Sequence, residues 1–381
     1  MRLSIKNRRS AITVLLCTAL AGSIVWPHGG LSATDGEYLF NDSHVHLTNY
    51  VQQGPSVREY IKTMGDTIGR SVLFGIPLQQ TWAYANSGDF APTYYLQTDA
   101  PLYYYSFTDA HIAQAYLSLP PEDRQRLDPM ITGFNPADMY GVDHIRRVLE
   151  TFPGVFTGIG EFSIHKEFVS SKVAGNTALL TDPALDRILA FAGEVGLLTI
   201  LHTDIDTPFA PDTEPVYLKQ TREVLVRHPN TTIIWAHTGL GRVVQPPGEQ
   251  ATIGAPVRNQ SHVQMLAALL EDPAFRHVHF DISWDEVVKY AISTPEVQRK
   301  VAALVNRFTD RFLFGTDVVA APDSSSAMRV FKLWEPIFSQ LTPEASLAIR
   351  KGNYERLFDA ARVRVRAWEA QNVKGTDIAR R

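Results

Sequence analysis

Short apolar runs alternate with longer amphipathic stretches along most of the chain. Strand-like runs lie at residues 39–46, 71–77, 130–135, 155–162, 197–204, 231–237, 278–282 and 312–317. Helix-like stretches lie between most of them, at residues 57–68, 141–151, 183–195, 215–227, 261–270, 295–307 and 325–338. Strand followed by helix, repeated eight times, predicts an α/β fold, the parallel (β/α)8 TIM barrel. A doubly wound open sheet is the alternative, disfavoured because no G-x-G-x-x-G follows the first strand.

Two stretches are longer than this repeat requires. Residues 79–126 predict a long insertion after the second strand, and residues 239–260 form a second long stretch rich in Gly and Pro. Connections of this length in a compact domain are usually functional or disordered. The final run, residues 343–369, predicts C-terminal helices packed outside the barrel.

The N-terminal segment has the pattern of an export signal. Residues 1–10 carry four basic residues and no acidic one, and residues 11–25 form an apolar run too short to predict a bilayer span. We therefore expect a signal peptide at residues 1–33, a domain at residues 34–381, and a periplasmic or secreted protein without stable membrane insertion. A retained N-terminal anchor is the alternative, and the choice between general and twin-arginine export stays open.

Composition narrows the chemistry further. Loss of the four basic leader residues would change the net charge from −4 to −8, which argues against nucleic acid as a partner. The chain has 45% hydrophobic residues, enough for a sizeable core. Its one cysteine, Cys17, lies in the expected leader, so the domain has no disulfide, thiolate nucleophile or Cys-ligated zinc. Any metal must be bound by nitrogen and oxygen atoms.

Polar residues able to bind a metal end five of the predicted strands. They are His44 and His46 on the first, Glu161 on the fourth, His202 on the fifth, His237 on the sixth and Asp317 on the eighth. Alternate residues of a strand point to one face, so both imidazoles of the H-x-H pair would point the same way. The carboxyl ends of barrel strands open on one face, so we expect all six side chains to lie close together.

The order of these residues resembles the amidohydrolase superfamily. The similarity is carried by D-S-H-V-H (42–46), G-I-G-E (158–161), L-H-T (201–203), W-A-H-T-G (235–239), F-G-T-D (314–317) and N-Y-E-R-L-F (353–358). It spans residues 38–360 and is greatest with the amidohydrolase-2 branch. That branch includes metal-dependent hydrolases and decarboxylases of the aminocarboxymuconate-semialdehyde type.

The resemblance implies a role for each strand-end residue. His44, His46, His202 and Asp317 would bind the metal, and His237 would lie beside it, polarising the substrate or ordering a water. Glu161 is a further candidate ligand that could bridge two metals. One ion or a Glu-bridged pair both remain open, whereas a carbamate bridge is disfavoured because the nearest lysine, Lys166, lies past the strand end. The ligand types suit Zn²⁺, with Mn²⁺, Fe²⁺ and Co²⁺ as alternatives.

Several neighbouring residues are weaker candidates. Asp204 and Arg242 follow His202 and His237 closely, so we expect them to contact the substrate. Asp281 ends the seventh strand and either orients a ligand histidine or caps the strand. The histidines in helical or loop runs are expected at the surface; they are His111, His144, His228, His262 and His277.

The expected function is a metal-dependent hydrolase that cleaves a C–N or C–O bond of a small molecule, such as an amide, lactone or ester. A bound metal lowers the pKa of its water from 15.7 towards about 7, and Asp317 would accept the proton that the water releases. Asp317 is therefore a catalytic candidate, together with His237, which would polarise the substrate or order the water. A non-oxidative decarboxylase on the same scaffold is the alternative. A third possibility is a non-catalytic binding protein with a structural metal, which would differ from an enzyme in having a filled coordination shell with no open position. A homo-oligomer stays open.

Export is directly testable. We expect mass spectrometry of the protein from its native cells to find an N-terminus between residues 20 and 37, in an extracytoplasmic fraction, because a signal peptidase removes the apolar run. An intact N-terminus in the cytosol would contradict this prediction.

Overall fold

The structure is a computed structural model. It describes residues 38–49, 53–76, 107–166, 172–173, 176–209, 215–247 and 260–373. The expected signal peptide, most of the insertion after the second strand and residues 248–259 lie outside the described residues.

Eight parallel strands form the centre of the molecule. In sheet order they are β1 (Phe40–Asp42), β3 (Ile68–Leu73), β4 (Leu127–Ile131), β5 (Gly158–Ser163), β8 (Leu198–His202), β9 (Ile233–Trp235), β10 (Val278–Asp281) and β11 (Phe312–Leu313). Each overlaps one of the eight apolar runs of the sequence. Neighbours in the sheet follow one another along the chain, as in a barrel built from strand–helix repeats.

Backbone hydrogen bonds join the first strand to the last and close the sheet into a barrel. The amide of Ser43 donates to the carbonyl of Phe314 at 3.2 Å, and the amide of Asp317 donates to the carbonyl of His44 at 2.8 Å. Beyond them, β2 (Val45–His46) pairs in parallel with β12 (Val318–Val319). The predicted (β/α)8 TIM barrel is therefore confirmed.

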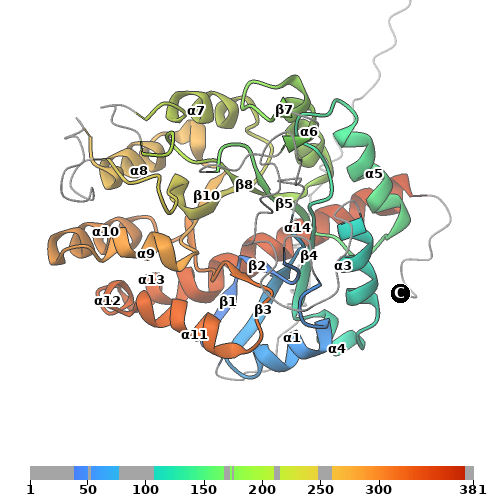
Figure 1. The fold of residues 1–381 in the computed structure, drawn as a ribbon, viewed down its shortest axis with the longest axis horizontal. Coiled ribbons are helices and arrows are strands. Elements are labelled where there is room, and N and C mark those ends of the chain that lie inside the picture. The colour runs from blue at the N-terminus through green and yellow to red at the C-terminus, as the bar shows by residue number, and fades with distance from the viewer. Residues whose placement is uncertain are drawn as a thin grey trace, which may run out of the picture. The chain divides into compact units, whose positions relative to one another are not determined.

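Helices surround the strands (Figure 1). They are α1 (Val57–Met64), α3 (Thr108–Leu117), α4 (Pro121–Arg124), α5 (Gly141–Thr151), α6 (Pro183–Val195), α7 (Leu218–Arg227), α8 (His262–Glu271), α9 (Asp285–Ala291), α10 (Pro295–Arg307), α11 (Ser324–Leu333), α12 (Glu335–Phe338), α13 (Pro343–Leu347) and α14 (Asn353–Asn372). A short antiparallel hairpin pairs β6 (Lys172–Val173) with β7 (Asn176–Thr177). No helix in the described part of the chain is both long and apolar enough to cross a bilayer.

Part of the predicted insertion is regular barrel structure. Helix α3 packs on β4 and supplies the helix expected between the second and third strands. Its apolar residues are spread around the helix rather than gathered on one face, so the sequence pattern did not reveal it. The stretch outside the repeat is therefore shorter than residues 79–126.

Local signals set the helix boundaries near their predicted positions. At α8, Ser261 Oγ accepts from the amide of Gln264 at 3.3 Å, and the Gln264 side chain accepts from the amide of Ser261 at 2.8 Å. Thr294 caps α10 in a similar way, through the amide of Val297 at 3.1 Å. Such caps satisfy amides that the first helical turn leaves without partners.

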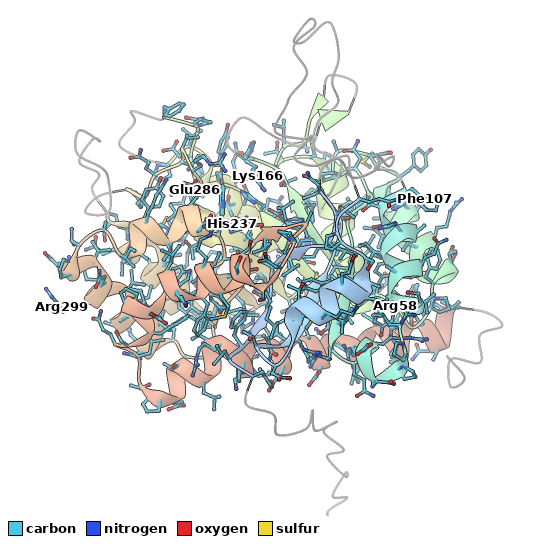
Figure 2. The ribbon with its side chains drawn as sticks, turned by 60° about the horizontal axis from the view of Figure 1, so that its bottom comes forward. Arg58, Phe107, Lys166, His237, Glu286 and Arg299 are labelled. Atoms are coloured by element: carbon cyan, nitrogen blue, oxygen red, sulfur yellow. The ribbon has the colours of Figure 1, made fainter. Side chains whose placement is uncertain are left out.

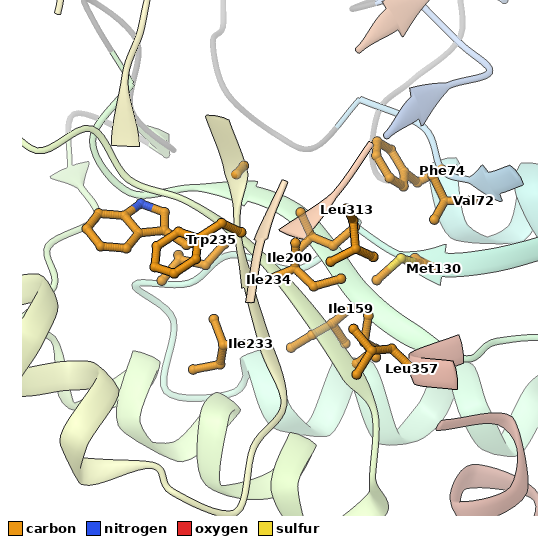
Figure 3. Packing of buried hydrophobic residues seen from close by; sticks show 14 of the residues in the cluster. Val72, Phe74, Met130, Ile159, Ile200, Ile233, Ile234, Trp235, Leu313 and Leu357 are labelled. Carbon is orange, nitrogen blue, oxygen red and sulfur yellow. The ribbon is translucent and has the colours of Figure 1, made fainter. Parts of the chain in front are cut away.

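Branched apolar side chains from successive strands fill the core (Figure 3). Val72, Ile159, Ile200 and Leu313 come from four different strands, and each is fully buried. Burial of such a side chain stabilises the fold by about 1.5–3 kcal/mol. This packing fixes the strands relative to one another, and with them the polar residues at their ends.

The C-terminal helix α14 is bound to the end of the barrel where the strands begin. Asp128, at the start of β4 and fully buried, accepts from Arg70 at 2.8 Å, Arg362 at 2.7 Å and the Tyr354 hydroxyl at 2.9 Å. Tyr354 and Arg362 belong to α14. The expected packing of C-terminal helices against the outside of the barrel is confirmed.

The prediction that five histidines lie at the surface is wrong for three of them. His228, His262 and His277 are buried, and His111 and His144 are half-buried. His262 lies in the first turn of α8 on its inward face, where its Nε2 contacts the carbonyl of Thr238 at 3.0 Å. Burial lowers the pKa of His262 from 6.5 to about 4.

This burial predicts a pH-dependent loss of stability. Below pH 6.5 the unfolded chain protonates His262 while the folded chain does not, so its contribution to stability is lost as the pH falls from 6.5 to about 4. At pH 5 the loss is about 2 kcal/mol. Between pH 7.5 and pH 5, His262→Gln should therefore lose about that much less unfolding free energy than the parent chain in urea titrations. Equal losses in the two proteins would contradict the assignment.

Candidate metal centre

The six strand-end residues of the sequence meet at one end of the barrel. His44 lies between β1 and β2, His46 in β2, Glu161 in β5 and His202 at the end of β8. His237 follows β9 in the short helix η3 (Ala236–Gly239), and Asp317 directly precedes β12. Five are buried, Asp317 is half-buried as a residue, and the side-chain exposures of all six lie between 0% and 8%. Figure 2 labels His237 at this end of the barrel.

Two imidazole nitrogens, of His44 and His46, approach the same two carboxylate oxygens, of Glu161 and Asp317. His44 Nε2 lies 3.5 Å from Glu161 Oε2 and 3.4 Å from Asp317 Oδ1. His46 Nε2 lies 3.2 Å from each of the same two oxygens. Ligand atoms at 2.0–2.1 Å around a tetrahedral zinc ion would stand about 3.3 Å from one another. These donors therefore have the spacing and the chemistry that a divalent ion requires.

Buried polar atoms without hydrogen-bond partners point to the same place. Among the side chains that the structure describes, they include His44 Nε2, Glu161 Oε2 and His237 Nε2. Potential ligand atoms of His44, Glu161 and His237 lie within 4.8 Å of one another, as do those of His44, His46 and Asp317. Buried polar groups are nearly always paired, so a bound cation would supply the missing partner.

The other oxygen of Glu161 faces a second group of donors. Glu161 Oε1 contacts Nδ1 of His202 and lies 3.9 Å from Nε2 of His237. His202 Nε2 in turn lies 3.1 Å from Asp204 Oδ1, so both ring nitrogens of His202 face carboxylates. Glu161 thus has His44 and His46 at one oxygen and His202 at the other, while His237 Nε2 lies near both carboxylates, 3.9 Å from Glu161 Oε1 and 3.9 Å from Asp317 Oδ2.

Hydrogen bonds to Nδ1 orient the imidazoles of His44 and His237. His44 Nδ1 lies 2.9 Å from Asp281 Oδ2. Ser283 donates its hydroxyl to Asp281 Oδ1, which leaves Ser283 Oγ to accept from His237 Nδ1 at 2.9 Å. We infer that, with a metal bound, both rings would keep their proton on Nδ1 and present the Nε2 lone pair to the ion, as metal ligation requires.

Asp281 therefore orients a histidine, which is one of the two roles left open by the sequence. It also accepts from the amides of His237 at 3.2 Å and Ser283 at 3.0 Å. Ser283 was not singled out by the sequence, because nothing marks a serine two residues past a strand end as polar support for a histidine far away in the chain.

Burial and neighbouring charges shift the pKa values of the residues at the centre. Burial acts to lower the pKa of His44, but the carboxylates of Asp281 and Asp317 outweigh it and raise that pKa well above its usual value. Burial acts to raise the pKa of Glu161, yet Lys166 and His202 hold it well below its usual value. His237 differs, because burial and the charge of His202 lower its pKa to about 3. His237 is thus neutral at pH 7.

Unusual backbone conformations position three side chains of the centre, those of Glu161, His237 and Asp317. Gly160, directly before Glu161, has φ 104°, and a Cβ there would stand 2.2 Å from the carbonyl oxygen of Ile200. Only glycine permits that approach of β5 to β8. His237 and Asp317 have φ values of 55° and 53°, in the left-handed region that non-glycine residues rarely adopt. Such strain is concentrated at functional sites.

Three further residues lie around this end of the barrel. Asp204, predicted to contact substrate, is buried and reaches the centre through His202. Arg242 is 57% exposed, lies 3.4 Å from Glu286 and places its guanidinium 5.6 Å from the centre of the Trp284 ring. Lys166, which the sequence placed past the strand end, lies 3.4 Å from Glu161 Oε1.

Comparison with known proteins identifies the family. The family model described as amidohydrolase matches residues 42–360, so the chain belongs to the amidohydrolase family and is an enzyme of that type. The family is metal-dependent, in keeping with the donor set described above. A search of curated proteins found no match.

Solved structures with a similar chain path share little sequence with this protein. A protein provisionally assigned as a 2-pyrone-4,6-dicarboxylic acid hydrolase from Pseudomonas putida is 15% identical over 85% of this chain and 98% of its own, with a TM-score of 0.48. A zinc-bound amidohydrolase from Burkholderia multivorans is 14% identical over 84% and 99%, also at 0.48. A 2,6-dihydroxybenzoate decarboxylase is 16% identical over 66% and 75%, at 0.38.

The contact between Asp281 and His44 predicts weaker metal binding when the carboxylate is lost. Asp281→Asn keeps the size of the side chain but cannot accept from both His44 Nδ1 and the amides, so we expect metal affinity to fall about 10- to 100-fold. Titration against a competing chelator measures this. Asp285→Asn, which alters a carboxylate paired with Arg329 outside the centre, is the matched control. Equal affinity in both variants would remove Asp281 from this role.

Proposed function

We propose that this enzyme is a metal-dependent hydrolase that activates a metal-bound water to cleave a C–N or C–O bond of a small molecule, such as an amide, a lactone or an ester. The observation that carries the proposal is that His44 Nε2 and His46 Nε2 each lie 3.2–3.5 Å from the same two carboxylate oxygens, Glu161 Oε2 and Asp317 Oδ1. Zn²⁺ suits these nitrogen and oxygen donors best, with Mn²⁺, Fe²⁺ and Co²⁺ as alternatives.

When bound, the ion supplies Lewis acidity at the substrate oxygen and lowers the pKa of its water from 15.7 towards about 7. Asp317 is the proposed proton acceptor. Burial acts to raise the pKa of Asp317, but the charge of His44 and the His46 hydrogen bond outweigh it and hold that pKa below its usual value, so Asp317 is ionised at neutral pH. From there it passes the proton to the leaving group.

His237 is proposed to order the attacking water. It is neutral at pH 7, its Nδ1 is engaged by Ser283, and its Nε2 lies 3.9 Å from Asp317 Oδ2. A neutral imidazole with a free Nε2 lone pair accepts a hydrogen bond, so it would orient a water whose other proton goes to Asp317.

Substrate contacts are proposed for two residues that differ in their surroundings. Arg242 is exposed beside Trp284 and offers a guanidinium to a carbonyl or carboxylate of the substrate. Asp204, which contacts His202 Nε2, would bind the substrate on the side of the centre where His202 lies. An activity screen of the metal-loaded enzyme against esters, lactones, amides and aromatic acids identifies the reaction on which every later test depends.

Replacement of Asp317 tests the mechanism. Asp317→Asn retains one oxygen donor but cannot take a proton, so it should keep most of the metal and lose about 10²- to 10⁴-fold in kcat. His44→Ala is the comparison, since it removes one of the four donors and should lose metal and activity together. Metal content is measured beside kcat for both variants. Full activity of metal-loaded Asp317→Asn would rule out the proton acceptor and favour non-oxidative decarboxylation, which needs no attacking hydroxide.

A further inference from the structure

We propose that the ammonium group of Lys166 occupies the place of a second metal ion beside Glu161, so that the enzyme binds one divalent ion, on the side of His44, His46 and Asp317. This inference rests on the proposed metal-dependent function and deepens it. The sequence left both one ion and a Glu-bridged pair open, and the arrangement around Glu161 favours one ion.

The two oxygens of Glu161 have different partners. Oε2 lies 3.5 Å and 3.2 Å from the Nε2 atoms of His44 and His46. Oε1 lies on the side of His202 and His237, and there Lys166 Nζ approaches it at 3.4 Å. One oxygen thus faces the four-donor site, while the other already has a positive charge beside it.

The surroundings hold the ammonium in this position. The Lys166 side chain is 13% exposed, and its Nζ lies 5.9 Å from the centre of the Trp284 ring. That ring lies 5.2 Å from the ring of His237. Attraction to an aromatic face and to a buried carboxylate both favour a cation there. Figure 2 shows Lys166 and His237 at the same end of the barrel.

A second ion would have to displace these contacts. An ion bound to Glu161 Oε1 would stand about 2.0–2.2 Å from that oxygen, close to an ammonium group 3.4 Å from the same atom, and the like charges would repel. His202 would also have to free a nitrogen, because Nδ1 faces Glu161 and Nε2 faces Asp204. Loss of the lysine charge removes the repulsion, and a divalent ion can then replace the proton held between His202 Nδ1 and Glu161 Oε1.

An ammonium group also changes what this side of the centre can do. It supplies a fixed positive charge and hydrogen-bond donors, but no vacant coordination position for a substrate or a water. Lys166 is therefore a positioning residue, which neutralises Glu161 and confines metal binding to one side of it.

Metal content tests the inference without any substrate. Metal-free protein is dialysed against excess Zn²⁺, washed, and analysed for zinc per chain by elemental analysis, for the parent chain, Lys166→Met, Lys166→Gln and Lys166→Arg. Lys289→Met is the matched control, because Lys289 pairs with Glu286 rather than with Glu161. We expect one ion in the parent, Lys166→Arg and Lys289→Met, and two in the uncharged Lys166 variants.

Manganese loading gives a second readout. Two Mn²⁺ ions bridged by Glu161 would be spin-coupled, so electron paramagnetic resonance should show a coupled pair in Lys166→Met and an isolated ion in the parent. Circular dichroism confirms folding, and the Met and Gln variants provide two neutral side chains in case one does not fold.

The outcomes separate this inference from the proposed function. Two ions in the parent chain, or one ion in every folded Lys166 variant, would overturn the role of Lys166 and leave the metal-dependent hydrolase intact. A parent chain that binds no ion at all under these conditions would contradict both proposals together.

Discussion

Closure of the barrel between its first and last strands is the constraint on which the candidate centre depends. The amide of Asp317 bonds to the carbonyl of His44, and the amide of Ser43 bonds to that of Phe314. These bonds place the H-x-H pair directly beside the aspartate of the eighth strand, although more than 270 residues separate them. Without that closure, His46 and Asp317 could not face the same point.

The cost of burying charge explains the composition of the centre. Glu161, Asp281 and Asp317 are carboxylates with little or no exposure, and an unpaired buried charge would be strongly unfavourable. Imidazoles and Lys166 provide partial compensation, and unpartnered atoms remain at His44 and Glu161. Binding of a divalent ion would pair those atoms and would stabilise the folded chain, since the ion has no equivalent site in the unfolded one.

One end of the barrel stabilises the fold and the other carries the residues for chemistry, as is general for this fold. Where the strands begin, Asp128 is fully paired with Arg70, Arg362 and Tyr354 and fixes helix α14. Where they finish, donor atoms are left without partners and the backbone of His237 and Asp317 is strained. The fully paired contacts at the start of the strands thus support the barrel, while the atoms left without partners at the other end are available to a metal ion.

Patterns along the chain were enough to predict the eight strands, the closed α/β architecture, the family and the residues that meet at the strand ends. These follow from local periodicity, caps such as Ser261, and the rule that parallel strands finish on one face. Helices α3, α4 and α9 escaped prediction because α3 lacks a clear apolar face and α4 and α9 have only four and seven residues. His262 was misplaced because a single polar residue on an inward helix face carries no local signal of burial.

The contacts between the strand-end side chains become visible only in the folded chain. Folding turned the two nitrogens of His202 towards Glu161 and Asp204, and it brought Ser283 to His237 and Lys166 to Glu161. Periodicity gives the face of a strand on which a side chain lies, but not which ring nitrogen or carboxylate oxygen faces which partner. Those contacts depend on distances of a few tenths of an ångström between separate strands and loops, which packing of the whole barrel sets.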